Sequence, residues 1–230
     1  MSTAADAEGT GRTVILAIDS ATTRVVVAVG TTDGTTIETT DWPAGYRHGE
    51  TLLPAVAGLL DRRAIARTSL AAIVVGTGPG AFTGLRVGIA TAKGLAHALG
   101  VPIIGISTAE ALLADAPADA VLLLPAGPSD RIVVGHGAPA RLVLAGEEPE
   151  AGANPGSLVA IDLAGRAPAD AVERGEAARA RLGRALVAIG ATRFAAGDVD
   201  DLTQLVPQYV TLPRGVRGEI GEVSWSRDRR

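Results

Sequence analysis

The feature that most constrains this sequence is an apolar stretch that leads through a glycine-rich turn into a long helical segment. Residues 71–76 (AAIVVG) are apolar without alternation, which is typical of a strand covered on both faces. Residues 77–84 (TGPGAFTG) predict a tight turn, and apolar residues then recur with helical spacing up to Leu99, where Gly100 offers a C-cap. A strand, a turn and a helix in this order indicate one unit of an α/β fold.

The segments on either side extend this unit into a mixed sheet. Three apolar or alternating segments come first, with an Asp-Gly turn before the third, and they predict an antiparallel meander. Helical periods and further apolar segments then alternate along the chain. The predicted strands are 13–19, 24–30, 35–40, 71–76, 101–106, 120–126, 131–136, 140–146 and 157–162, and the predicted helices are 48–63, 84–99, one from Thr108 and 173–190.

Composition excludes several classes of protein. The 230 residues include no cysteine, and the three histidines (His48, His97 and His136) are too far apart for a local zinc site, so no metal site is expected. No apolar run is long enough for a transmembrane helix and no secretory signal is visible, so we expect a cytoplasmic protein without membrane contact. A net charge of −4 argues against binding nucleic acid unaided.

Both ends of the sequence differ from the middle. Residues 1–12 are small and polar, and we expect them to be disordered. Residues 213–230 form a locally basic tail, to which no function is assigned, with Arg214, Arg217, Arg227, Arg229 and Arg230.

The helix after the glycine-rich turn carries small residues where good helix formers would be expected. Internal glycines such as Gly88 and Gly94 each cost a helix about 1 kcal/mol relative to alanine, so packing has to compensate. On a helical wheel, Gly84, Gly88 and Thr91 fall on one side together with Leu95. Close packing within the chain and contact with a helix of a second protein both explain this smooth side.

The turn itself has three interpretations. Its Gly78-Pro79-Gly80 amides lie at a helix N-terminus, which suits an anion. Gly76, Gly78 and Ala81 also match a loosened dinucleotide-binding pattern, but no acid ends the following strand. A plain tight turn is the third interpretation, and a Walker A loop is excluded because no Gly-Lys-Ser/Thr closes it.

A second chemical candidate follows the first strand. Asp19 ends that strand, and the hydroxyl-bearing Ser20 and Thr22 lie in the next turn. Such a group can hold a metal–phosphate complex, but it also suits an Asx or Ser/Thr turn that joins two strands. His48, near the start of a helix, is interpreted as a capping or packing residue.

Three segments together resemble one known family. ILAIDSATT (15–23), RHGETLLP (47–54) and GTGPGAFTGLRVGIATAKGLAHALGVPIIGIST (76–108) are similar in order and spacing to the TsaB (YeaZ) proteins, and Pro207–Val210 is weakly similar to a short strand of that family. The resemblance implies an α/β fold of the actin/sugar-kinase/Hsp70-like (ASKHA) type, with two lobes of mixed β-sheets and helices. We place these lobes at 13–107 and 108–212.

The resemblance also implies a function. The chain would be a non-catalytic partner of the transferase TsaD, with the ATPase TsaE, in threonylcarbamoylation of the adenosine beside the tRNA anticodon. It would form a homodimer when alone, contact tRNA only indirectly and carry no catalytic residue, while ATP or ADP at the partner interface is left open. The expected interface residues are Leu52, Leu53, Val56, Leu60, Gly84, Arg86, Val87, Gly88, Thr91 and Leu95, and the expected vestigial phosphate loop comprises Asp19, Ser20, Thr22, Gly78 and Gly80.

An ATP-dependent kinase-like enzyme of the same superfamily is the alternative. It would need a second phosphate loop, and none is visible after residue 108. The paired histidines of the related enzyme are missing, and no Ser/His/Asp arrangement supports a protease. The hairpin 125–136 departs from the family because its acids and tyrosine are absent, and Arg131 is the candidate to stand in for its arginine.

Overall fold

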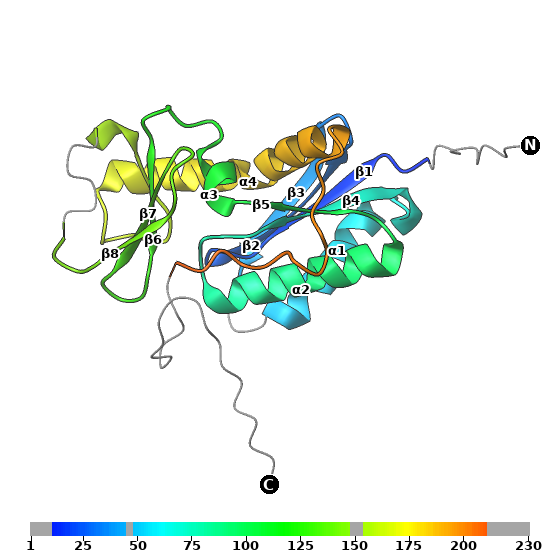
Figure 1. Ribbon diagram of the computed structural model, residues 1–230, viewed down its shortest axis with the longest axis horizontal. Coiled ribbons are helices and arrows are strands. Elements are labelled where there is room, and N and C mark those ends of the chain that lie inside the picture. The colour runs from blue at the N-terminus through cyan, green and yellow to red at the C-terminus, as the bar shows by residue number, and fades with distance from the viewer. Residues whose placement is uncertain (1–10, 45–47, 148–153, 211–230) are drawn as a thin grey trace, which may run out of the picture.

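The computed structural model describes residues 11–44, 48–147 and 154–210, which form two lobes built on two mixed sheets (Figure 1). Residues 1–10 and the basic tail therefore lie outside the described residues, so the expectations for them stay predictions. Within the described ranges, no helix is long and apolar enough to cross a membrane.

The first lobe holds a five-stranded sheet with the order β3-β2-β1-β4-β5. The three hairpin strands pair antiparallel, whereas β1, β4 and β5 run parallel. Every residue of β1 and β4 is buried, as the apolar runs in their sequences predict. The strands are β1 (Val14–Asp19), β2 (Arg24–Thr31), β3 (Thr36–Pro43), β4 (Leu70–Gly76) and β5 (Ile103–Ile106).

Helices cover both faces of this sheet. Leu16 and Ile18 belong to the core formed with α1 (His48–Arg62) and α2 (Phe82–Leu99). Ile15 and Ala17 point to the opposite face, where α4 (Ala169–Ala195) packs, because successive strand residues alternate between faces. A short 3-10 turn, η1 (Arg67–Ser69), precedes β4.

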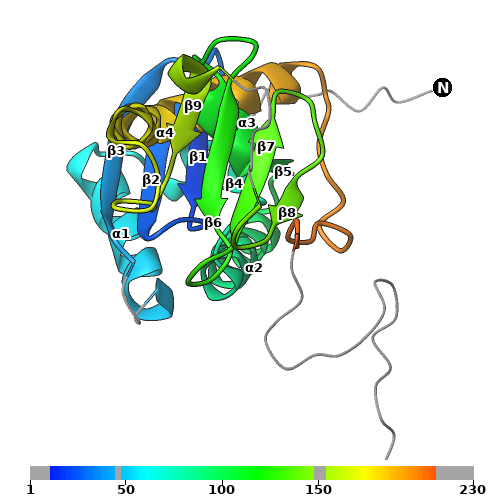
Figure 2. The ribbon, with the colours of Figure 1, turned by 90° about the vertical axis from the view of Figure 1, so that its left-hand side faces the viewer.

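The second lobe holds a four-stranded sheet with the order β8-β7-β6-β9 (Figure 2). The short helix α3 (Thr108–Leu113) enters this lobe directly from β5. The strands of the second lobe are β6 (Val121–Pro125), β7 (Arg131–Gly135), β8 (Arg141–Val143) and β9 (Leu158–Ala160), with the 3-10 turn η2 (Pro155–Ser157) before β9.

The long helix α4 joins the two lobes, because it packs on the first sheet and also against β9 and α3. One hydrophobic core is continuous from Ile15 of the first sheet to Ile132 of the second. After α4 the chain returns to the first lobe, where Asp200 pairs with Ile103 and the Gln208 amide donates to the Thr77 carbonyl at 2.8 Å.

The predicted order of elements and the two-lobed ASKHA-like class are confirmed, while several boundaries move. The last helix covers 169–195 and is therefore longer than the predicted 173–190. Its first and last turns contain no apolar period from which they could be predicted, but they are rich in alanine, which favours a helix. The third strand continues to Pro43 because Trp42 and Asp41 pair with β2. Residues 140 and 144–146 fall outside the short β8.

Candidate functional site

The carboxyl ends of the parallel strands β1, β4 and β5 meet at the edge of the first sheet that faces the second lobe. Ligands of open α/β sheets bind at such edges. Asp19 ends β1 and is fully buried there. The Thr108 hydroxyl donates to its Oδ2 at 2.7 Å, and the Ala21 amide donates to its Oδ1 at 2.9 Å. Asp19 therefore holds the end of β1 against the start of α3.

Glycine at position 76 makes this arrangement possible. A Cβ atom there would lie 1.8 Å from Asp19 Oδ2 and 2.9 Å from the Thr108 hydroxyl. Burial raises the pKa of the Asp19 carboxyl to about 6, although the hydrogen bonds from Thr108 and Ala21 act in the opposite direction. Gly76 of the dinucleotide-like pattern is thus explained by close packing against a carboxylate.

The expected phosphate loop residues do lie together. Ser20 donates its hydroxyl to the Gly84 carbonyl at 2.7 Å, and the Thr22 hydroxyl donates to the Arg24 carbonyl at 3.1 Å. Gly80 sits so close to this turn that a Cβ atom would meet the Ala21 carbonyl at 2.1 Å.

Contacts within the chain also occupy backbone groups of the glycine-rich turn. The Ala81 amide donates to the Ala21 carbonyl at 2.7 Å, and the Gly78 amide donates to the Thr108 hydroxyl at 3.0 Å. Of these two amides, only that of Gly78 belongs to the group predicted to suit an anion, and it is used to pack α3 against the glycine-rich turn.

A cavity of about 240 Å³ lies between the lobes beside the β1–β2 turn. Its lining is mostly apolar, and its polar side chains are those of two threonines and one aspartate. The residues that line it are Ala21, Thr22, Thr23, Ala44, Gly80, Ala81, Leu124, Pro125 and Asp162.

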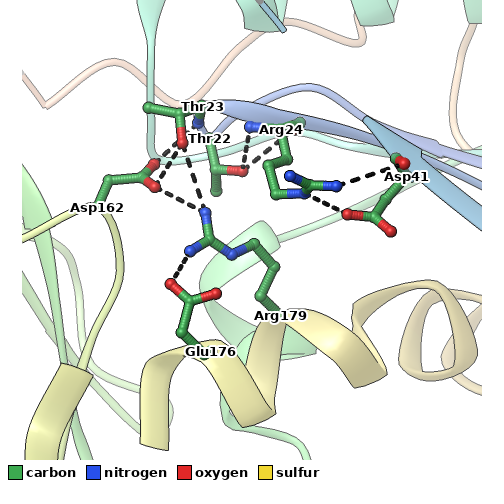
Figure 3. Close-up of polar contacts among 7 residues, drawn as sticks. All are labelled: Thr22, Thr23, Arg24, Asp41, Asp162, Glu176 and Arg179. Atoms are coloured by element: carbon green, nitrogen blue, oxygen red, sulfur yellow. Dashed lines mark hydrogen bonds and ion pairs between the residues drawn. The ribbon is translucent and has the colours of Figure 1, made fainter. Parts of the chain in front are cut away.

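Three residues of this region were missed by the sequence analysis. Asp162 follows β9 and accepts hydrogen bonds from Thr23 and from Arg179 on α4 (Figure 3). One signal was present, since Asp162 ends a predicted strand in the same way as Asp19. Arg179 had no signal of its own, because it is one of several arginines in an alanine-rich helix.

The ten expected interface residues divide equally between interior and surface. Five are buried in the isolated chain and belong to its own packing: Leu52, Val56, Leu60, Gly84 and Gly88. The others reach the surface wholly or partly: Leu53, Arg86, Val87, Thr91 and Leu95. Leu53 is 50% exposed, which makes it the most accessible apolar member of the set.

The buried glycines of α2 correct the expectation that they form the smooth outer side of the helix. A Cβ atom at Gly88 would lie 2.2 Å from the Ser20 hydroxyl oxygen, so this glycine admits the β1–β2 turn. Gly94 has open space around its Cβ position, and both it and Ala90 are exposed. The exposed small side of α2 is therefore turned about the helix axis from the predicted one.

The C-terminal segment runs along α2. The Arg86 guanidinium lies 3.6 Å from the centre of the Phe82 ring, and its Nε donates to the Tyr209 hydroxyl at 2.8 Å. Further along, Lys93 donates to the Thr203 carbonyl at 3.5 Å. These contacts place Tyr209, from the weakly family-like segment, beside the exposed side of α2.

The β6–β7 hairpin, which departs from the family pattern, is held by hydrogen bonds with Arg166. Arg166 donates to the carbonyls of Gly127 at 3.0 Å and Pro128 at 2.9 Å, and Arg131 donates to the Arg166 carbonyl. In the part of the chain that the structure describes, no cluster of three or more His, Asp or Glu side chains could hold a metal ion.

A family model and several known proteins resemble this chain. The model, described as TsaD, tRNA N6-adenosine threonylcarbamoyltransferase, matches residues 43–172, which is more than half of the 230 residues. A tRNA threonylcarbamoyladenosine biosynthesis protein TsaB from Escherichia coli is 40% identical over 41% of this chain and 40% of its own length. The TsaB of Bacillus subtilis is 43% identical over 30% of each chain. The chain thus spans less than half of the length of these curated relatives.

One solved structure shows the same fold. YeaZ from Pseudomonas aeruginosa superposes with a TM-score of 0.62 at 23% sequence identity, covering 86% of this chain and 99% of the other. At this identity the match demonstrates the two-lobed architecture alone.

Proposed function

This chain belongs to the TsaB (YeaZ) branch of the TsaD family, and from this premise we propose that it serves in the biosynthesis of threonylcarbamoyladenosine in tRNA. The observation that carries the proposal is the match of the family model to residues 43–172, together with relatives that are named for this pathway. Those residues include α1, α2 and the glycine-rich turn, which hold most of the expected site residues.

Within this pathway the chain is a non-catalytic partner that activates a TsaD-type transferase, and a TsaE-type ATPase joins the complex. In support, Asp19, the strand-end acid, is buried and bonded to Thr108 and Ala21. An acid used in this way fixes two segments of the fold and does not reach a substrate in the cavity.

The partner docks on the exposed side of α2. The centre of this side of α2 consists of small or half-buried residues, which let another helix approach closely. These residues are Val87, Ala90, Thr91 and Gly94. Leu53 of α1 adds exposed apolar area. The same side forms a homodimer when the catalytic subunit is absent, since a symmetric contact covers it equally well.

Contact with tRNA is made through the catalytic subunit, because a chain with a net charge of −4 repels phosphates. The place proposed for ATP or ADP is the interface with the partner. The complex works in the cytoplasm.

Depletion of this chain from its own cells tests the proposal. We expect threonylcarbamoyladenosine in hydrolysed tRNA, measured by mass spectrometry, to fall strongly and to return when the chain is supplied again. A level that does not change on depletion sinks the proposal.

The kinase-like alternative has its own test. The isolated chain is expected to show no ATP turnover above a buffer control, whereas turnover that disappears in Asp19→Asn would favour the enzyme. In such an enzyme, the β1–β2 turn would have to lose its contacts with Gly80 and Asp162 before it could bind a phosphate group.

A further inference from the structure

The β1–β2 turn presents two hydrogen-bond donors of Thr23 to the second lobe. The Thr23 amide donates to Asp162 Oδ2 at 2.8 Å, and its hydroxyl donates to Asp162 Oδ1 at 2.5 Å. The two residues are 139 positions apart, so this contact joins the lobes (Figure 3). One residue thus binds both oxygens of one carboxylate.

A buried cation completes this arrangement. Arg179 on α4 donates from Nη1 to Asp162 Oδ1 at 2.7 Å, and the two side chains are only 8% and 9% exposed. The other terminal nitrogen, Nη2, contacts Glu176, whose side chain is 58% exposed. The Arg179 Nε is buried and has no hydrogen-bond partner among the described residues.

A backbone amide, a hydroxyl and a guanidinium that converge on one point are the groups that proteins use to bind oxyanions. We propose that Thr23 and Arg179 form an anion site between the lobes, which the chain fills with its own Asp162 carboxylate. The ligand class that fits is a small oxyanion, either a carboxylate or a phosphate group.

Asp162 reaches the site from a backbone position that favours glycine. Its φ angle is 57°, in the left-handed region that residues other than glycine seldom adopt. Asparagine and aspartate tolerate this region better than most residues. Asp162→Gly therefore removes the carboxylate without adding backbone strain.

There is room for a free ligand once the carboxylate is removed. Cavities of about 240 and 380 Å³ flank the contact, and Thr23 and Asp162 line both of them. The Asp162 carboxylate lies in the wall shared by these two spaces. Its removal leaves a space for an anion of similar size.

The neighbouring charges leave Arg179 as the cation of the site. The other arginine in the larger cavity, Arg24, is already paired with Asp41. Without Asp162, the only carboxylate among the described residues that still contacts Arg179 is the exposed Glu176. In the native chain a free anion must compete with a tethered carboxylate, whose effective concentration is on the order of millimolar or higher.

Anion rescue of stability tests this site in the full-length chain. We would measure urea unfolding of wild type, Asp162→Gly and Asp41→Ala in formate, in inorganic phosphate and in chloride at equal ionic strength. Asp41→Ala is the matched control because it leaves another arginine of the same region without its carboxylate.

Only Asp162→Gly is expected to gain stability from formate beyond the chloride series. The gain should follow simple binding linkage, so that above the dissociation constant each tenfold rise in formate raises the folding equilibrium constant about tenfold. A matching gain in phosphate assigns the site to phosphate groups as well, and a gain in formate alone limits it to carboxylates. An Asp162→Gly chain that responds to every anion as wild type and Asp41→Ala do overturns the proposal.

A chain that fails to fold remains informative. If Asp162→Gly does not fold in chloride, refolding in formate supports the site. The double variant Asp162→Gly/Arg179→Met removes both charges and is expected to fold and to ignore the anions. If that double variant folds while Asp162→Gly stays unfolded in every anion, the proposed site is rejected.

Discussion

Two aspartates, one from each lobe, meet the same kind of donors and differ in one partner, and the side chain of the first is fully buried while that of the second is 9% exposed. Asp19 ends β1 and accepts from the Ala21 amide and the Thr108 hydroxyl. Asp162 follows β9 and accepts an amide and a hydroxyl that both belong to Thr23. The difference is the guanidinium of Arg179, which contacts Asp162 and has no counterpart among the described neighbours of Asp19.

The comparison shows how a fold can use a buried acid in two ways. Without a cation, burial is the dominant influence on Asp19 and raises its pKa to about 6, so the carboxyl stays protonated to a higher pH than an exposed aspartate does. With a cation, Asp162 forms an ion pair that links α4 to the β1–β2 turn. Asp19 therefore holds the end of β1 against the start of α3, and Asp162 joins the β1–β2 turn of the first lobe to the second lobe.

The largest effect is expected on the Asp19 side of the comparison. Gly76→Ala would place a Cβ atom 1.8 Å from Asp19 Oδ2, so the buried carboxylate would have to move away and lose its hydrogen bonds from Thr108 and Ala21. We expect a loss of about 4–5 kcal/mol in the free energy of unfolding, or no folded protein at all.

The control for this change is Gly94→Ala, whose Cβ position is open. This variant should be slightly stabilised, because alanine favours a helix over glycine. Both are checked by thermal unfolding followed by circular dichroism. A Gly76→Ala chain as stable as wild type would show that the contact with Asp19 is looser than described.

The next largest effect concerns the cation. Arg179→Met leaves the Asp162 carboxylate, which is only 9% exposed, without the buried guanidinium beside it, and we expect it to cost about 3–5 kcal/mol. Adding Asp162→Gly to this variant removes the stranded charge and should recover part of the loss. Urea unfolding of wild type, the two single variants Arg179→Met and Asp162→Gly, and the double variant measures the coupling, and strictly additive losses would mean that the pair does not act as a unit.

A smaller effect follows from the protonation of Asp19. Because its pKa is raised in the folded chain, the folded state binds a proton more tightly than the unfolded state. Stability is therefore fully present below about pH 4 and declines as the pH rises to about 6, by about 3 kcal/mol from a shift of roughly two pKa units.

Asp19→Asn removes this dependence while keeping an acceptor for the Ala21 amide. The free energy of unfolding of Asp19→Asn, relative to that of wild type, should therefore increase between pH 4 and pH 7, because only wild type loses stability in this range. Unfolding curves at pH 4, 5, 6 and 7 test this expectation, and a constant difference between the two proteins would contradict the raised pKa.

The smallest effect belongs to an exposed pair close to Asp162. Arg24 and Asp41 form an ion pair with side chains that are 33% and 45% exposed. Asp41→Ala is expected to cost less than about 1 kcal/mol, because solvent screens such pairs. A loss as large as that of Arg179→Met would mean that burial does not distinguish the two arginines.

The same aspartates show how far the sequence could lead. Asp19 was predicted at a strand end beside Ser20, and both lie where the order of strands requires. The apolar runs and helical periods are sufficient to predict the strands and helices, because these patterns depend on residues that are neighbours along the chain. The partner of Asp19, Thr108, is 89 residues away, so the sequence contained no local sign of it.

The side of α2 that faces outward was predicted less well. The pattern of small residues around the helix predicts Gly88 on the outer side, yet Gly88 faces Ser20. A helical wheel gives relative positions about an axis but does not fix which side meets the sheet when small and apolar residues surround much of the helix. Gly94, the exposed glycine, could be distinguished only in three dimensions.

The most direct test of the account is co-purification of this chain with the TsaD-type subunit of the same organism. We would compare wild type with Gly94→Arg on the exposed side of α2 and with Ala180→Arg, an exposed position on α4 over the opposite face of the sheet. Wild type and Ala180→Arg should retain the partner, and Gly94→Arg should lose it while its circular dichroism spectrum is unchanged. A complex that survives Gly94→Arg, or a wild-type chain that never binds the subunit, would contradict the proposed role.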